Sequence, residues 1–147
     1  MPEKETIERA REDAKEGKSA STQAGEFVRE EFHHVREGKH GARSPQQAIA
    51  IGLSKARRAG VKLGPPKGSA SASTRRKAAQ DTRAGQHPDR KKSAKRSKAI
   101  SGALKREPRG STSHTALSKQ AKKAASRRGP QSRRAAAKKA ARTRKAA

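Results

Sequence analysis

Hydrophobic residues are sparse along this chain and recur at helical spacing in only two stretches. With about 100° per residue, a helix over residues 22–36 gathers its apolar residues on one side: Ala24, Phe27, Val28, Phe32 and Val35. Ser21 or Thr22 can cap this helix and Gly38 can end it. Glu31 falls inside the apolar arc, which is anomalous for an ionised side chain.

The second stretch predicts a helix with clear ends. Ser44 can cap it, Pro45 suits its first position, and Gln47 completes a Ser-x-x-Gln capping box. Gly60 marks its end. Its apolar stripe consists of Ile49, Leu53, Ala56 and Gly60. Gly52, beside the stripe, would let a partner helix approach closely.

The two helices are joined by residues 37–43, a normal connection for antiparallel neighbours, so residues 21–63 are interpreted as a helical hairpin. Its apolar residues are few for an independent domain. Ile51 also points toward the basic face of its helix. We therefore expect self-association, or folding on a protein partner, through the 21–63 hairpin.

The remaining segments carry little hydrophobic pattern. Residues 1–20 are predicted to form an acidic, frayed helix over 6–15, with Thr6 as its cap, and residues 64–74 a Gly/Pro/Ser linker. The tail, residues 75–147, has three helix-prone blocks at 90–106, 115–128 and 132–145, without a continuous apolar face. The predicted fold class is mainly α: a small helical hairpin followed by a long, largely disordered, helix-prone basic tail.

Composition and charge sharpen this picture. The formal net charge is +26, and only 29% of the residues are hydrophobic. Residues 1–37 hold 7 basic and 10 acidic residues. Residues 38–64 hold 6 basic residues and no acidic one, and residues 65–147 hold 26 basic and 3 acidic residues. There is no cysteine, no long apolar run and no apolar leader at the N-terminus. We expect a cytoplasmic protein.

Clusters of lysine and arginine predict binding to phosphate, with release of condensed counterions and strong salt dependence. The candidate nucleic-acid-binding residues are Lys55, Arg58, Arg75, Arg76, Lys77, Arg90, Lys91, Lys92, Lys95, Arg96, Lys122, Lys123, Arg127, Arg128, Arg133, Arg134, Lys138, Lys139, Arg142 and Arg144. The expected function is nonspecific DNA binding, with histone-like compaction or protection of the nucleoid. RNA or ribosome association is an alternative, as is a protein-interaction module, residues 21–63, with a cationic tether.

Other chemistry is poorly supported by the residues. Base reading would need a rigid recognition helix, which Gln46, Gln47, Lys55 and Arg58 could only imitate. His33, His34 and His40 are interpreted as surface histidines rather than metal ligands, because adjacent helical histidines point about 100° apart. No cofactor is expected. No catalytic set or membrane-binding apolar face is recognisable, so we expect neither an enzyme nor a membrane partner.

The stretch from Ser21-Thr22-Gln23-Ala24-Gly25 through Arg36-Glu37-Gly38-Lys39-His40-Gly41-Ala42-Arg43-Ser44 to Ala56-Arg57-Arg58-Ala59-Gly60 resembles a family of short bacterial proteins. That family is a domain of unknown function, often labelled DNA-binding or histone-like. The resemblance covers roughly residues 1–66 and implies a bacterial origin. The tail resembles the Ala/Lys-rich tails of linker histones and bacterial histone-like proteins by composition.

Overall fold

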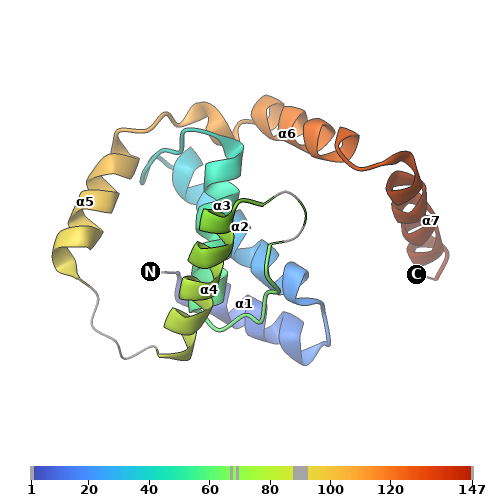
Figure 1. Cartoon of the computed structure of the whole chain (residues 1–147), viewed down its shortest axis with the longest axis horizontal. Helices are drawn as coiled ribbons and strands as arrows, with labels where there is room; N and C mark the ends of the chain where they lie inside the picture. The colour runs from blue at the N-terminus through green and yellow to red at the C-terminus, as the bar shows by residue number, and fades with distance from the viewer. Residues whose placement is uncertain (1, 67, 69, 88–92, 147) are drawn as a thin grey trace. The chain divides into compact units, whose positions relative to one another are not determined.

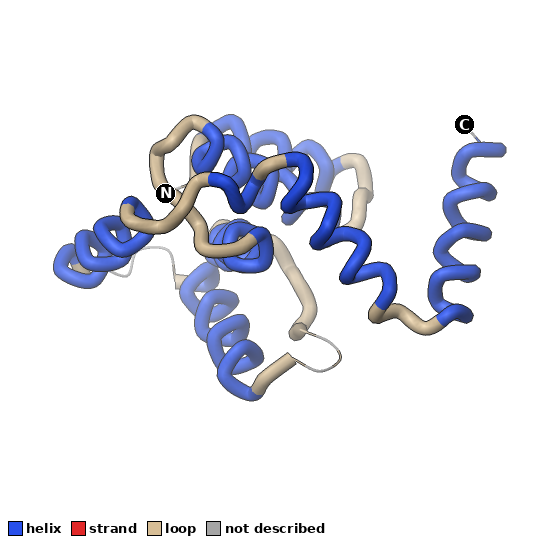
Figure 2. The backbone as a smooth tube through the Cα atoms, turned by 90° about the horizontal axis from the view of Figure 1, so that it is seen from above, coloured by secondary structure: helices blue, strands red, loops and turns tan. Residues whose placement is uncertain are grey.

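The computed structural model describes residues 2–66, 68, 70–87 and 93–146, and in these ranges the regular elements are helices (Figures 1 and 2). The helices are α1 Lys4–Lys15, α2 Ala20–Arg36, α3 Pro45–Arg58, α4 Ala72–Gln86, α5 Ala94–Lys105, the short 3₁₀ helix η1 Gly110–Thr112, α6 His114–Ser126 and α7 Pro130–Ala146. The mainly α fold class is therefore confirmed. The prediction of a largely disordered tail is wrong, because the described parts of residues 75–147 are mostly helical.

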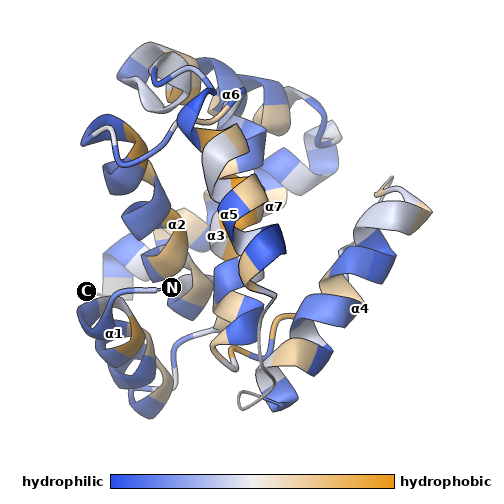
Figure 3. Ribbon diagram, turned by 90° about the vertical axis from the view of Figure 1, so that its left-hand side faces the viewer, coloured by the Kyte–Doolittle hydropathy of each residue, from blue (hydrophilic) through white to orange (hydrophobic). Residues whose placement is uncertain are grey.

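The chain forms two compact units, Met1–Thr112 and Ser113–Ala147. In the first unit α2 and α3 form the predicted antiparallel pair. The two backbones lie close together at Gly52, where an added Cβ would lie 2.7 Å from the Val28 Cα. The prediction that Gly52 admits a neighbouring helix is confirmed. Hydrophobic patches in this unit are short and lie between hydrophilic stretches (Figure 3).

Helix α1 packs against α2 as part of the fold. Its Ile7 and Ala10 join a small core with Ala24, Phe27 and Ala56. Thr6 is fully buried inside α1 instead of capping it, so that expectation was wrong. A helix with so few apolar residues still docks, because the facing side chains are small and the surrounding polar groups pair with α2, as Arg9 does with Glu26 at 2.8 Å.

Helix α4 lies where the sequence predicted the end of a linker and the start of a disordered tail. Ser71 caps α4. Ser73 and Thr74, residue types typical of linkers, lie in the first turn of the helix. It packs on α3 through Ala78, through Gly85 against the carbonyl of Arg57, and through Asp81. Small residues and one buried carboxylate thus replace the apolar face that the sequence lacks.

The segment after α5 also belongs to the first unit. The Gly41 amide donates to the Leu104 carbonyl at 2.8 Å, and the Ala42 amide donates to the Pro108 carbonyl at 2.9 Å. Arg36 donates to the Thr112 carbonyl, and Thr112 is fully buried. The folded module therefore extends well beyond the hairpin of residues 21–63, and segments of the same chain cover it.

Local signals set the helix ends. Ser44 accepts from the Gln47 amide as predicted, but the Gln47 side chain accepts from the Arg43 amide, one residue before the expected partner in the capping box. Helix α2 starts at Ala20 with Ser19 as its cap, two residues earlier than predicted. Gly38 and Gly60 follow α2 and α3 with positive φ, as terminating glycines do.

The second unit consists of α6 and α7. Ser113 caps α6, and Pro130 begins α7 after Gly129. These helices confirm two of the three helix-prone blocks, and α5 confirms the third over its described residues. Every described residue from Ala121 to Lys145 is exposed.

The close approach at Gly52 gives a stability prediction. Gly52→Ala should lower the free energy of unfolding by roughly 1–3 kcal/mol, because α2 must move away from the new methyl group. Gly25→Ala in α2 is the matched control, since an added Cβ there meets nothing within 4 Å. The control should leave stability unchanged or raise it by about 0.5–1 kcal/mol. Denaturant melts of the full chain measure both, and equal effects would contradict the packing.

Asp81 gives a pH prediction for the docking of α4. Burial raises the pKa of this carboxyl, but hydrogen bonds from Ser54 and Arg58, with the charges of Arg58 and Lys77, outweigh burial and hold it below its ordinary value. Its stabilising contribution is therefore present above the unfolded value near 3.8 and is lost as pH falls through the lower folded pKa.

Asp81→Asn should lower the free energy of unfolding by about 1–3 kcal/mol at neutral pH, because it weakens hydrogen bonds to a charged group. The difference from the unaltered chain should shrink as the pH is lowered below 4. Glu8→Gln, an exposed neutralisation on α1, should change stability by less than about 0.5 kcal/mol. A pH-independent loss for Asp81→Asn would rule out the ionic contribution.

Candidate nucleic-acid interface

The second unit carries half of the candidate residues, on exposed helix surface. Residues 113–147 hold 12 lysines and arginines and no acidic residue. All of these cations are exposed. The predicted residues among them are Lys122, Lys123, Arg127, Arg128, Arg133, Arg134, Lys138, Lys139, Arg142 and Arg144. Because the unit contains no carboxylate side chain, its positive charge is not compensated within the unit.

Helix α7 places part of this charge in one row. At helical spacing, Arg134, Lys138, Arg142 and Lys145 fall within an arc of about 80° and extend over about 16 Å of helix. Neighbours four residues apart repel one another, which costs an isolated helix roughly 0.2–0.5 kcal/mol per pair. Lys145 was not among the predicted residues, although it directly follows Arg144. Its position three residues after Arg142, on the same side of the helix, is the signal that identifies it.

Other candidates lie in the first unit. Arg75, Arg76 and Lys77 are exposed on α4, and Lys95 and Arg96 are exposed on α5. Lys77 pairs with Asp81 at 3.3 Å, and Arg75 donates to the Gly68 carbonyl. The candidates Arg90, Lys91 and Lys92 lie outside the described residues.

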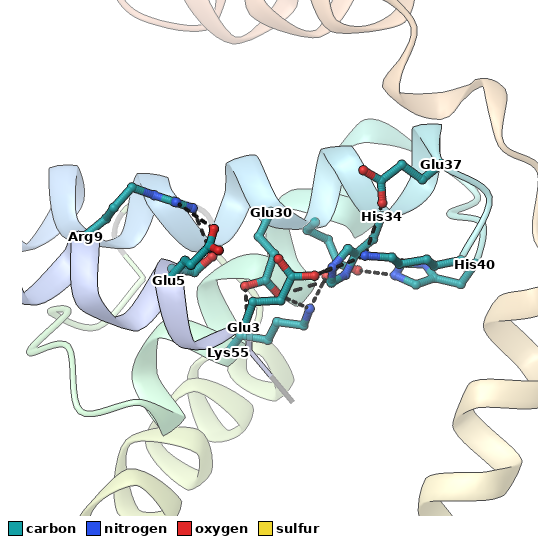
Figure 4. A network of polar contacts seen from close by, with 11 residues as sticks. Glu3, Glu5, Arg9, Glu30, His34, Glu37, His40 and Lys55 are labelled. Atoms are coloured by element: carbon teal, nitrogen blue, oxygen red, sulfur yellow. Dashed lines mark hydrogen bonds and ion pairs between the residues drawn. The ribbon is translucent and has the colours of Figure 1, made fainter.

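Lys55 and Arg58 differ from the others, because both are bound to acidic groups within the fold. The Lys55 ammonium lies 2.9 Å from a Glu30 oxygen and 2.7 Å from a Glu31 oxygen (Figure 4). Arg58 donates to Asp81 at 2.8 Å. The side chain of Lys55 is only 20% exposed, so we assign it to the fold and leave it out of the interface.

The network around Lys55 perturbs several pKa values. Burial raises the pKa of Glu30. Hydrogen bonds donated by Lys55 and by the Glu3 amide lower it by more, so the pKa lies below its ordinary value. Burial lowers the pKa of Lys55, but Glu31 and Glu30 raise it above its ordinary value. Hydrogen bonds from His34 and Lys39 lower the pKa of Glu3 to about 2. These shifts favour ionised Glu3, Glu30 and Lys55 near neutral pH.

Two of the three neighbouring histidines are in this network rather than at the surface. His33 is exposed as predicted, but His34 is buried and His40 is partly buried, so the surface interpretation of those two was wrong. Ligand atoms of Glu31, His34 and His40 lie within 4.8 Å of one another, and these residues could hold a metal ion. His33 and His34 are adjacent on α2 and do point in different directions. His40 approaches His34 from the α2–α3 loop, and helical spacing on α2 does not indicate the position of a loop residue.

Helix α3 is poorly suited to enter a DNA groove. It packs against α2 and also against α4 (Figure 1). Of the four residues that could imitate base-reading groups, Lys55 is bound to α2 and Gln47 caps the helix.

No family model, no curated protein and no solved structure matches this chain. The resemblance to the bacterial family therefore stays a prediction. Among the described residues, no helix combines the length and apolar character needed to cross a membrane.

The assignment of Lys55 to the fold predicts a split between stability and binding. Lys55→Met should lower the free energy of unfolding by roughly 3–5 kcal/mol, because it leaves buried carboxylates without their cation. Lys62→Met, at an exposed position just after α3, should have little effect on stability. Denaturant melts compare the two variants. A stable Lys55→Met chain with weakened DNA binding would return Lys55 to the interface.

Proposed function

We propose that this protein binds duplex DNA without sequence preference, through the exposed cations of residues 113–147 and the exposed basic residues of α4 and α5. It acts without an enzymatic activity of its own, as a histone-like protein that compacts or protects the nucleoid. The observation that carries the proposal is the presence of 12 exposed cations and no acidic residue in the second unit.

The contrast between the units supports this role. In the first unit many charges bind partners within the fold, as Arg9, Lys55 and Arg58 do. Residues 113–147 contain no aspartate or glutamate that could be such a partner, and their cations are exposed. Each phosphate that a lysine or arginine neutralises releases condensed counterions, which is the driving force for nonspecific binding.

The absence of base-reading groups favours nonspecific binding. Residues 113–147 contain no phenylalanine, tyrosine or tryptophan on which unstacked bases could stack. The one glutamine of α7, Gln131, lies in its first turn, and lysine, arginine and alanine make up most of the helix. Such a surface binds backbone phosphates and leaves the base edges unread.

The row on α7 provides the test. Replacing Arg134, Lys138, Arg142 and Lys145 together by Gln should weaken binding to any duplex. The slope of log Kobs against log salt concentration should fall by about 3–4, because each phosphate contact contributes about 0.9. Fluorescence anisotropy with two duplexes of unrelated sequence, at several salt concentrations, measures this.

The matched control replaces Ala135, Ala136, Ala137 and Ala140 by Gln. It introduces the same side chains into the same exposed helix without removing charge. The control should keep the original slope. An unchanged slope in the charge variant would refute the proposal, and a strong preference for one duplex would refute nonspecific binding. Tighter binding to duplex RNA than to DNA would favour the RNA alternative.

A further inference from the structure

The buried cluster of Glu31, His34 and His40 shares no residue with the proposed DNA-binding surface and has no part in that function. Glu31 and His34 are three residues apart on α2, and His40 is in the loop that leads to α3. The Glu31 side chain is fully buried. One of its oxygens lies 2.7 Å from the Lys55 ammonium and the other 3.1 Å from His40 Nε2. Neither oxygen accepts a hydrogen bond of acceptable geometry.

The contacts of His40 determine which of its nitrogens carries a proton. Nδ1 lies 3.0 Å from the carbonyl oxygen of Gly41, which can only accept a hydrogen bond, so Nδ1 must be the donor. In the neutral ring Nε2 then holds a lone pair, and that lone pair faces the carboxylate of Glu31. Two lone pairs 3.1 Å apart repel each other unless a cation lies between them.

His34 shows the same arrangement. Its Nε2 lies 2.9 Å from a carboxylate oxygen of Glu3, so Nε2 is the donor and Nδ1 holds the lone pair of the neutral ring. The two imidazole rings are 6.0 Å apart and nearly perpendicular (Figure 4). Metal-ligating histidines typically donate their second nitrogen to a carboxylate or carbonyl, and that contact fixes the tautomer and the ring orientation. Both histidines here have such a contact.

We propose that Glu31, His34 and His40 bind one divalent transition-metal ion of the Zn²⁺ type, with a fourth position left for water. Two imidazoles and one carboxylate are a known zinc ligand set. Ligand atoms each about 2.0 Å from a tetrahedral zinc are about 3.3 Å apart, so the 3.1 Å separation of His40 from Glu31 already fits. The three ligand atoms, all within 4.8 Å of one another, need only a small inward shift.

The second oxygen of Glu31 fits the same assignment. The Lys55 ammonium lies 2.7 Å from it, and such a charged neighbour helps to orient a ligating carboxylate. With Lys39 close to Glu3 and Glu37, the surroundings contain four carboxylates and two lysines. They therefore retain a negative charge that a divalent cation can neutralise. A cleft lined by Glu3, His34 and Lys39 opens one member of the cluster, His34, to solvent.

Metal binding would fix the α2–α3 loop. His40 precedes Gly41, whose amide donates to the Leu104 carbonyl, so the ion would also steady the contact of the loop with the end of α5. A hard cation such as Mg²⁺ should not replace it, because imidazole nitrogen favours zinc and its neighbours in the transition series.

The test uses the full chain freed of metal by a chelator, in a buffer without nucleic acid. Isothermal titration with Zn²⁺ should show one ion bound per chain, no competition by Mg²⁺, and a higher melting temperature for the zinc-bound form. Co²⁺ should give the visible absorption bands of a site of low coordination number. Failure to bind one Zn²⁺ at micromolar concentrations would overturn the proposal.

Variants place the ion at this cluster. His40→Gln should reduce Zn²⁺ affinity at least tenfold and abolish the Co²⁺ bands, whereas His33→Gln, at the exposed neighbour of His34, should change neither. If His40→Gln does not fold, as judged by circular dichroism, Glu31→Gln replaces it with a side chain of the same shape. Equal zinc binding by the cluster variant and by His33→Gln would refute the site. DNA binding by the second unit should be unaffected, so this test is independent of the proposed function.

Discussion

The contact of Lys55 with Glu30 and Glu31 is the interaction on which the rest of the first unit depends. It joins α3 to two buried carboxylates of α2. Glu30 also accepts from the Glu3 amide at the start of α1, and Glu31 faces His40 in the loop. Three separate segments are thus positioned by one ammonium group. Because unpaired buried carboxylates are costly, each of these contacts restricts the others.

Such a network is needed because large apolar side chains are scarce. The two small cores are built mainly from alanine around Phe27 and Val35. Gly52 brings the α2 and α3 backbones close enough for these small residues to touch, and Gly85 does the same for α4 on α3. Close backbone approach recovers some of the dispersion attraction that bulky side chains normally provide. Buried ion pairs and hydrogen bonds such as those of Asp81 then fix which helix faces meet.

The elements that could be predicted from the sequence are those specified by local chemistry. Ser44, Gly38 and Gly60 act on neighbouring backbone groups, so the ends of the α2–α3 hairpin followed from spacing alone. The docking of α4 could not be predicted, because it depends on Asp81 meeting Ser54 and Arg58 more than 20 residues away. Glu31 was recognised as anomalous, but a sequence pattern does not reveal that a lysine from α3 and a histidine from the loop surround it.

The same reasoning explains why helix formation and the proposed DNA binding would be linked in the second unit. Helix α7 is rich in alanine, yet its cations at four-residue spacing repel one another and nothing in the unit neutralises them. Phosphates along a DNA backbone would remove that repulsion at the positions where it is strongest. Binding would then stabilise the helix, and the helix would hold its cations in a row for binding. The helices around Lys55 need no such ligand, because the carboxylates of Glu30 and Glu31 already neutralise this partly buried cation.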